Sequence, residues 1–260
     1  MKLALLGTNI QESKSPKLYR HFGAIAGINI NYELIDTEFN SLEKGAKLNR
    51  IVKEFFRNEG HGLSVTSPFK RMAFDICDQH HKSAMRTQSV NTIVRKNDRL
   101  IGYNTDLFGF EKALTSRINL GGIKKVLIIG TGAVVRTLIH VLNKRGTDVY
   151  ITGRNLEEAN LIASEYINGH VFPVHMSCLD THYDLVVNAT PNGDALPNTI
   201  TYSVAYSLSY HETPFSRSAK IRCGCSILGD EMLLYQAIEA FEVFSQSRIS
   251  LTKNHWLLYL

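Results

Sequence analysis

Short apolar runs and amphipathic segments alternate along nearly the whole chain. In the first half, the apolar runs are typical of buried strands, and the segments between them have apolar residues at helical spacing. Ser15 and Pro16 precede the first such segment, which predicts Ser15 at the N-cap and Pro16 at the first helical position. The pattern predicts strands at 2–7, 31–36, 62–65, 89–95 and 100–103, and helices at 15–28 and 42–56. The last two strands, separated by "KNDR", are predicted to form a β-hairpin.

The pattern becomes more regular near residue 107, where strand and helix signals alternate without interruption. Helices are predicted at 106–114, 133–142, 156–166 and 230–244, and strands at 124–130, 148–154 and 183–190. Repeated βα units of this kind imply a parallel sheet with right-handed crossovers. We therefore predict two α/β domains, one formed by 1–105 with the C-terminal helices at about 238–260, the other by 106–237.

Composition and charge exclude several classes of protein. Of the 260 residues, 44% are hydrophobic and 20% are charged, as in ordinary globular proteins. The net charge of +5 is spread along the chain without a basic run, so we expect no nucleic-acid partner. No apolar stretch approaches the roughly 18–20 residues that span a bilayer, and "MKLALLGTNI" suits a first strand better than a signal peptide. We expect no membrane association.

The cysteines and histidines do not form a recognisable metal site. Cys223 and Cys225 lie too close for a usual structural disulfide or zinc knuckle, and no second cluster accompanies them. His80 and His81 are neighbours that would not share a helix face. We expect no metal, and reduced thiols in the cytoplasm.

A glycine turn joins a buried strand to an amphipathic helix in "IIGTGAVV". Glycines in this setting let the backbone approach a pyrophosphate, while the helix N-terminus supplies N–H donors and positive potential. Gly130, Thr131, Gly132 and Ala133 are therefore candidate cofactor residues, although Val135 stands where the third small residue is usual. A plain tight turn is the alternative. The strand–turn–helix context favours a doubly wound, Rossmann-type dinucleotide domain.

The end of the next strand indicates which dinucleotide would bind. NAD-binding domains usually carry an acidic residue there for the ribose 2′-hydroxyl, whereas this chain has "TGRN", with Arg154 and Asn155. A guanidinium pairs well with a 2′-phosphate. The sequence thus favours NADP over NAD, with an exposed arginine that opens a helix as the alternative.

Polar side chains collect at the ends of the predicted strands in the first half. Each has an ordinary explanation alone, since Ser15 would cap a helix, Asn91 would end a strand and Asp106 would cap the next helix. Together they would surround the edge of a sheet where open α/β folds bind ligands. A lysine beside an aspartate in a closing cleft is a plausible proton-transfer pair. The group comprises Ser13, Ser15, Ser64, Thr66, Lys70, Asn91, Asn104, Thr105 and Asp106.

These motifs resemble those of the shikimate dehydrogenase family, which reduces 3-dehydroshikimate with NADPH. The matching stretches are "SKSP", "SVTSPFK", "SVNTIV", "GYNTDLFGF", "NATPNG" and "GDEMLLYQAIEAF", and they occur in the family's order over nearly the whole chain. The resemblance implies a mixed α/β substrate domain beside a Rossmann NADP domain, with the active site in the cleft between them. It also implies a small-molecule substrate, a place in chorismate and aromatic amino acid biosynthesis, and a monomer or homodimer.

The resemblance assigns a role to each matching residue. Lys70, paired with Asp106, would be the catalytic acid and base. Ser13 and Ser15 would hold the substrate carboxylate, with Tyr206 nearby. The ring hydroxyls would be bound by Thr66, Asn91, Asp106 and Gln236. The cofactor would be held by Gly130, Gly132, Arg154, Asn155 and Thr190, with Met232 facing the nicotinamide.

The chain departs from the family pattern mainly in its cofactor half. Val135 is expected to crowd the contact between helix and strand. Glu231, at a usual glycine beside Met232, would either bring a carboxylate toward the cofactor phosphate or face solvent. The departures are Ser64 for asparagine, Ala133 and Val135 in the glycine turn, Gly153 and Asn155 around the arginine, Glu231, and the lack of the Asp and Asn-Pro of "DxxYNP".

Two alternatives stay open at the level of sequence. A broader enzyme would accept quinate and use NAD, against which Arg154 and the serine pair Ser13 and Ser15 both argue. A non-catalytic relative would bind shikimate-like ligands or a nucleotide without turnover. Lys70 and Asp106 argue against that second alternative, whereas Glu231 and Val135 argue for it.

Overall fold

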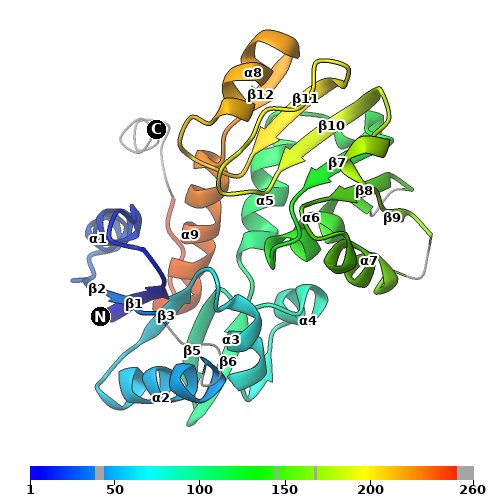
Figure 1. Ribbon diagram of the computed structural model, residues 1–260. Helices are drawn as coiled ribbons and strands as arrows, with labels where there is room; N and C mark the ends of the chain where they lie inside the picture. The colour runs from blue at the N-terminus through cyan, green and yellow to red at the C-terminus, as the bar shows by residue number, and fades with distance from the viewer. Residues whose placement is uncertain (39–43, 144–145, 167–168, 251–260) are drawn as a thin grey trace. The chain divides into compact units, whose positions relative to one another are not determined.

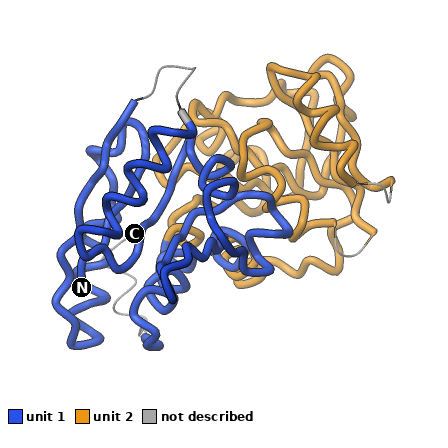
Figure 2. Tube along the Cα trace, turned by 90° about the horizontal axis from the view of Figure 1, so that it is seen from below, with its two compact units in different colours: residues 1–109, 234–260 blue, residues 110–233 orange. Residues whose placement is uncertain are grey.

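The structure is a computed structural model that describes residues 1–38, 44–143, 146–166 and 169–250. It contains two compact units, unit 1 with Met1–Gly109 and Leu234–Leu260, and unit 2 with Phe110–Leu233 (Figure 2). The first residues of the predicted helix at 42–56 lie outside the described residues. The same holds for the end of the predicted C-terminal region at 238–260.

Unit 1 is a mixed α/β unit around a six-stranded sheet with the order β2-β1-β3-β5-β6-β4 (Figure 1). β1, β2 and β3 are parallel, whereas β5 is antiparallel to both β3 and β6. Its elements are β1 (Lys2–Gly7), α1 (Ser15–Ala26), β2 (Asn31–Asp36), α2 (Lys44–Arg57), β3 (Gly62–Val65), α3 (Lys70–Ile76), β4 (Gln79–His80), α4 (Lys82–Thr87), β5 (Thr92–Lys96), β6 (Arg99–Tyr103), most of α9 (Asp230–Ser245) and the start of α5 (Asp106–Thr115).

Both faces of the unit 1 sheet are covered by helices. Successive side chains of β1 point to opposite faces of the sheet, so neighbouring residues pack in different clusters. Leu3 and Leu5 join a core cluster with α1 and α9, while Ala4 and Leu6 join a cluster with α2, α3 and α4. Because both faces are buried, β1 is apolar throughout and its sequence does not alternate between apolar and polar residues.

The predicted β-hairpin is confirmed, and its turn has a local cause. β5 and β6 pair antiparallel, with Lys96 opposite Arg99. Asn97 and Asp98, the two residues between them, both have positive φ, 50° and 59°. Asn and Asp tolerate this conformation, and a two-residue turn of this kind matches the twist of the strands.

The start of α1 differs from the prediction. Lys14 occupies the N-cap, and Ser15 is the first helical residue. The hydroxyl of Ser13 accepts a hydrogen bond from the Ser15 backbone N–H at 3.2 Å, so Ser13 satisfies a free donor of the first turn. The Ser15 side chain is therefore not used as a cap.

Unit 2 is built on a parallel six-stranded sheet with the order β12-β11-β10-β7-β8-β9. Read from β9, its strands follow the 3-2-1-4-5-6 order of a doubly wound Rossmann fold. α7 packs on β8 and β9, and α8 packs on β11 and β12. Its elements are η1 (Leu120–Gly122), β7 (Lys125–Ile129), α6 (Val134–Leu142), β8 (Asp148–Thr152), α7 (Leu156–Ser164), β9 (Val171–Pro173), η3 (Met176–Cys178), β10 (His182–Asn188), β11 (Thr201–Ser207), α8 (Pro214–Arg222) and β12 (Cys225–Ile227).

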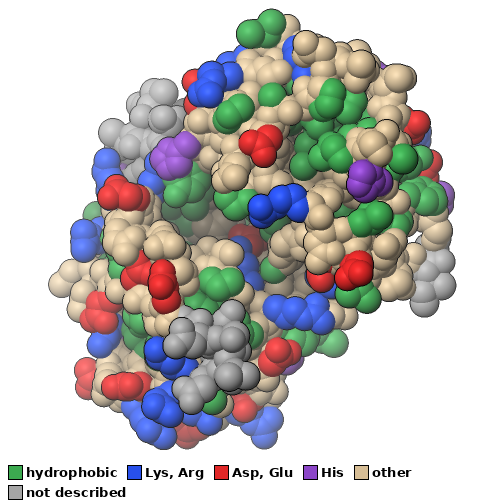
Figure 3. Space-filling view, viewed as in Figure 1, with side chains coloured by type: hydrophobic (Ala, Val, Ile, Leu, Met, Phe, Trp, Pro, Cys, Tyr) green, Lys and Arg blue, Asp and Glu red, His purple; other side chains and the backbone are tan. Residues whose placement is uncertain are grey.

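The described residues show neither a membrane span nor a metal cluster. No described helix is long and apolar enough to cross a bilayer. Within the same residues, no three His, Cys, Asp or Glu side chains are grouped so that they could hold a metal ion. On the face in Figure 3, basic and acidic side chains are interspersed.

Candidate active site

The topology of unit 1 brings four separate segments to one edge of its sheet. β1, β3 and β6 end at this edge, and β5, which runs in the opposite direction, begins there. The residues that follow β1, β3 and β6 and precede β5 therefore converge. They are the predicted polar residues Ser13, Ser15, Thr66, Lys70, Asn91, Asn104, Thr105 and Asp106.

Lys70 is positioned by an apolar anchor and by its own backbone. It is the first residue of α3, and the preceding Phe69 is 1% exposed within the core beneath the sheet. The Lys70 carbonyl accepts a hydrogen bond of 2.8 Å from the Val90 N–H. These two contacts direct the lysine stem away from the core and toward the polar edge.

Lys70 and Asp106 form a short, nearly buried ion pair. Lys70 Nζ donates to Asp106 Oδ2 at 2.6 Å, and the side chains are 17% and 8% exposed. The other carboxylate oxygen, Oδ1, accepts a 3.0 Å hydrogen bond from Asn91 Nδ2. Because water screens this pair little, its two charges interact strongly and hold each other in place. The pair is therefore suited to transfer a proton to or from a bound ligand.

Asn91 is the centre of a buried hydrogen-bond network around this pair. Its Oδ1 accepts from the Thr105 N–H at 2.8 Å and from Thr92 Oγ1 at 2.9 Å. Its Nδ2 donates to Thr105 Oγ1 at 2.9 Å and to Gln236 Oε1 at 3.4 Å, in addition to Asp106. Gln236 comes from α9, so a residue far away in the sequence completes the group. Asn91 thus has a larger role than ending a strand.

Asn104 fixes the loop that carries Asp106. Its Nδ2 donates 2.8 Å hydrogen bonds to Thr87 Oγ1 and Ser89 Oγ, and its Oδ1 accepts from the Asp106 N–H. Asp106 is therefore the first residue of α5 and leaves its carboxylate free for Lys70. The repeated Asn and Thr letters of this stretch were the sequence signal for such a network.

The glycine turn of unit 2 has the geometry that a pyrophosphate requires. Gly130 has φ +122°, and a Cβ there would lie 3.3 Å from the backbone of Ala189, the residue after β10. β7 and β10 are the adjacent strands at which the sheet order reverses, where doubly wound sheets bind their ligands. A Cβ on Gly132 would meet open space, so the backbone there is accessible to a ligand.

The first turn of α6 is open to an anion. Its N-cap, Ala133, makes no side-chain capping bond, and the helix runs from Val134 to Leu142. The N–H groups of an uncapped first turn and the positive end of the helix attract phosphate. The residues present therefore fit a dinucleotide.

The arginine turn lies against the glycine turn. A Cβ on Gly153 would approach Thr131 Cγ2 to 3.1 Å, and the next residue, Arg154, is exposed. Asn155 has a structural task, because its Oδ1 accepts from the Glu158 N–H and caps α7. Its amide nitrogen is the part left for a cofactor.

Thr190 and Met232 are the other predicted cofactor residues. Thr190 Oγ1 donates to Asn188 Oδ1 at 2.8 Å and accepts from the Gly193 N–H at 3.2 Å, which shapes the turn after β10. Met232 is 8% exposed near the start of α9.

Comparison with known proteins identifies the family. Residues 5–93 match the family model of the shikimate dehydrogenase substrate binding domain, and residues 114–199 match that of shikimate / quinate 5-dehydrogenase. The chain is 33% identical to the shikimate dehydrogenase (NADP(+)) of Acinetobacter baylyi, over 96% of this chain and 98% of that one. The chain belongs to the shikimate dehydrogenase family.

Solved structures of this family share the fold over nearly the full length. The shikimate dehydrogenase of Aquifex aeolicus has a TM-score of 0.85 and 28% identity, covering 96% of this chain and 94% of that chain. The enzyme of Thermus thermophilus, solved in complex with NADP(H) and shikimate, has a TM-score of 0.79 and 28% identity, covering 96% and 95%. The N-terminal substrate domain and Rossmann-type domain expected from the sequence are thereby confirmed as the fold class.

Two departures from the family pattern have clear surroundings in the structure. Val135 is fully buried, so its side chain packs inside unit 2 while α6 still begins directly after the glycine turn. Glu231 is 8% exposed and accepts hydrogen bonds from Arg117 Nε at 2.9 Å, from Arg117 Nη2 and from Ser116 Oγ at 3.1 Å. The Arg117 guanidinium thus compensates the negative charge of Glu231, for which the sequence had indicated no partner.

The Arg117–Glu231 pair should show an asymmetric response to mutation. Arg117 is 53% exposed and Glu231 only 10% by side chain. Arg117→Ala leaves a buried carboxylate without its counter-ion and should cost about 2–3 kcal/mol of unfolding free energy, whereas Glu231→Gln leaves a solvated arginine and should cost about 1 kcal/mol or less. Urea unfolding measures both. The exposed Lys220–Glu212 pair is the control, where Lys220→Ala should change nothing measurable. A larger cost for Glu231→Gln would contradict this account.

Tyr206 is placed differently from the other predicted substrate residues. It lies on β11 of unit 2 with 0% exposure, and its ring packs edge-to-face on Phe110 at 5.2 Å. Burial raises the pKa of its hydroxyl, and no described side chain or backbone group hydrogen-bonds it. In this position the hydroxyl is closed to a ligand from solvent.

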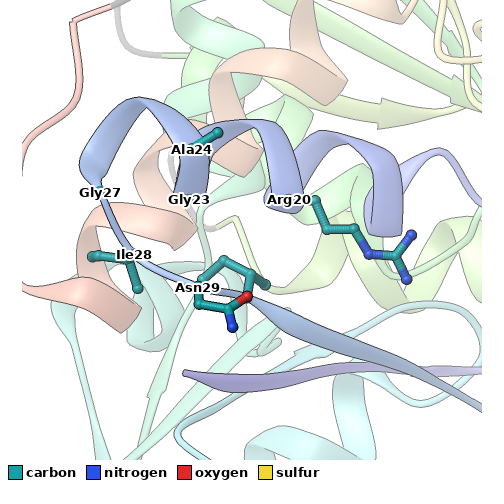
Figure 4. Close-up of a pocket in the computed structure, with 7 residues that line it drawn as sticks. Arg20, Gly23, Ala24, Gly27, Ile28 and Asn29 are labelled. Carbon is teal, nitrogen blue, oxygen red and sulfur yellow. The ribbon is translucent and has the colours of Figure 1, made fainter.

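A surface pocket of about 410 Å³ lies away from the polar network, at the C-terminal turn of α1 (Figure 4). Its charged lining residue is Arg20, accompanied by the amide of Asn29, and glycine and aliphatic residues form the rest. It offers no acid–base pair, so the candidate site remains the edge with Lys70 and Asp106.

Proposed function

We propose that this protein is an NADP-dependent shikimate dehydrogenase that reversibly reduces 3-dehydroshikimate to shikimate. The observation that carries the proposal is the 2.6 Å contact between Lys70 Nζ and Asp106 Oδ2 inside a buried network of amides and hydroxyls. Family membership supports the same conclusion.

The polar network is suited to a ring that carries several hydroxyl groups. Asn91, Gln236 and Asp106 offer both donors and acceptors within one buried group, and Thr66 lies half-buried at the same edge. A site built to hydrogen-bond hydroxyl groups strongly rejects analogues that lack them. Ser13, between β1 and α1, and Ser15, the first residue of α1, supply hydroxyl donors for the carboxylate.

Lys70 is the proton donor in the direction of reduction and the acceptor in reverse. Asp106 holds its ammonium in place, and the hydrogen bond from Asn91 holds Asp106. NADPH, when bound, supplies the hydride. Lys70 delivers a proton to the carbonyl oxygen, so that the ketone becomes an alcohol, and solvent later returns a proton to the lysine.

We propose unit 1 as the substrate-binding and catalytic domain and unit 2 as the NADP-binding domain. The open backbone at Gly132, the uncapped start of α6 and the exposed Arg154 support a phosphate-rich cofactor in unit 2. The free thiols support a cytoplasmic location. We further propose a monomer or homodimer with a small-molecule substrate and neither nucleic-acid nor membrane partners.

Arg154 should decide the preference between the two nicotinamide cofactors. Arg154→Ser removes the charge offered to the 2′-phosphate and should raise the KM for NADP about 10- to 100-fold, while the KM for NAD stays nearly the same. Arg217→Ser, at another exposed arginine of unit 2, is the matched control. An equal rise in the KM for NADP and for NAD would show that Arg154 does not bind the 2′-phosphate.

The proposed function is tested by following NADP reduction with shikimate, then with quinate, and repeating both with NAD. We expect turnover with shikimate and NADP that exceeds the other three combinations. Comparable turnover of quinate with NAD would indicate the broader enzyme. Calorimetric binding of shikimate without turnover would indicate a non-catalytic relative, and neither binding nor turnover would reject the proposal.

A further inference from the structure

Two buried tyrosines meet beneath the substrate edge of unit 1. Tyr19 on α1 and Tyr32 on β2 are 2% and 5% exposed, and their ring centroids lie 4.8 Å apart. Tyr32 Oη donates to Ser64 Oγ at 3.4 Å. Neither tyrosine was singled out in the sequence, because each occupies an ordinary core position of its element.

Small residues on β3 make room for this arrangement. Gly62 and Ser64 point to the same face of the sheet, and a Cβ on Gly62 would lie only 2.2 Å from the Phe244 ring. Tyr19, Tyr32 and Phe244 belong to one apolar cluster on this face. Ser64 is 9% exposed, so its hydroxyl is a buried polar group that faces these aromatic side chains.

The hydrogen-bond directions determine what Ser64 can do. Burial raises the pKa of both tyrosine hydroxyls, so both are neutral and can donate. The Tyr32 hydroxyl donates to the Ser64 oxygen. A serine hydroxyl has one proton to donate and two lone pairs. Because the Tyr32 hydroxyl donates to its oxygen, the Ser64 proton is left for another partner.

Ser64 also lies next to the polar network of the site. It is paired with Thr92 across β3 and β5, and the Thr92 hydroxyl donates to Asn91 Oδ1 at 2.9 Å. Residues directly opposite each other in an antiparallel pair point to the same face of the sheet, so the Ser64 hydroxyl lies on the face that carries this network.

We propose that Tyr32 is a positioning residue that orients the hydroxyl of Ser64 as a hydrogen-bond donor toward the oxygens of the bound substrate. This rests on the proposed function, since the substrate is taken to be shikimate. Tyr32 contacts Ser64 and acts through it. Its hydroxyl therefore contributes to substrate affinity and leaves the proton transfer at Lys70 unaffected.

Tyrosine-to-phenylalanine variants test the proposal, because they keep the rings and remove only the hydroxyls. We expect Tyr32→Phe to raise the KM for shikimate about 5- to 20-fold, with kcat within about twofold and the KM for NADP unchanged. The control is Tyr202→Phe, a comparably buried tyrosine in unit 2, which should leave all three constants unchanged. Ser64→Ala should raise the KM similarly, and adding Tyr32→Phe to it should add little. Thermal melting confirms that each variant is folded.

The outcomes separate this proposal from the proposed function. If the wild type turns over shikimate but Tyr32→Phe keeps its KM and only melts earlier, Tyr32 is a core residue and this inference is wrong. If the wild type shows no turnover, the proposed enzyme fails, and the shikimate Kd of the same variants decides instead. A weaker Kd in Tyr32→Phe then supports the inference, and an unchanged Kd or no binding overturns it.

Discussion

Replacing Lys70 with alanine should lower kcat for shikimate oxidation by a factor of about 10²–10⁴, while the KM changes little. The reason is that proton transfer is an interaction of the transition state, and no other cationic group takes part in the described contacts of Asp106. At a factor of about 10³ the loss corresponds to about 4 kcal/mol of transition-state stabilisation. Steady-state kinetics with shikimate and NADP measure it.

Lys70→Arg is the informative control for this prediction. Arginine keeps the positive charge and the ion pair with Asp106, but a guanidinium does not release its proton near neutral pH. We expect it to fold as the wild type does and to be nearly as inactive as Lys70→Ala. Substantial activity in either variant would show that Lys70 supplies charge or packing and not the proton.

Asp106→Asn should be the second most damaging change, with kcat lowered about 100-fold or more. Asparagine has nearly the same shape, yet it removes the negative charge that holds the Lys70 ammonium at 2.6 Å. It also replaces the acceptor of the Asn91 amide with a group that can turn its own N–H₂ toward it. The lysine then loses its fixed direction toward the substrate.

The double variant Lys70→Ala/Asp106→Asn tests whether the two residues work as one unit. Groups that act together show strongly non-additive losses, so the double variant should be about as inactive as the worse single one. Losses that multiply would mean that Asp106 contributes through the ring hydroxyls independently of Lys70. The measurement is again kcat, with urea unfolding to confirm that all three variants are folded.

Elements and turns were predictable where their causes are local. The strands at 2–7, 31–36 and 62–65 and the hairpin turn at Asn97–Asp98 depend on neighbours in the chain, and the structure confirms them. The N-cap at Ser15 was wrong although the letters suited it, because Ser13 reaches the first helical N–H and the helix begins one residue earlier.

Site residues were predictable by type but not by task. The sequence indicated that Asn91, Asn104 and Asp106 belong together, but not that Asn91 is the centre of their hydrogen bonds. Nor did it indicate that Arg117 neutralises Glu231, since these residues are more than a hundred positions apart. Long-range pairs of this kind leave no periodic pattern in one sequence.

The sequence by itself determined the alternation of strands and helices, the polar residue types at the strand ends, the glycine turn and the family motifs. These follow from interactions over a few neighbouring residues and from the letters themselves. Only the tertiary structure decided which strands are adjacent, that Lys70 meets Asp106 across 36 positions, and that Tyr32 reaches Ser64. The physical reason is that strand order is set by burying both faces of each sheet at once, a condition that no local segment can express.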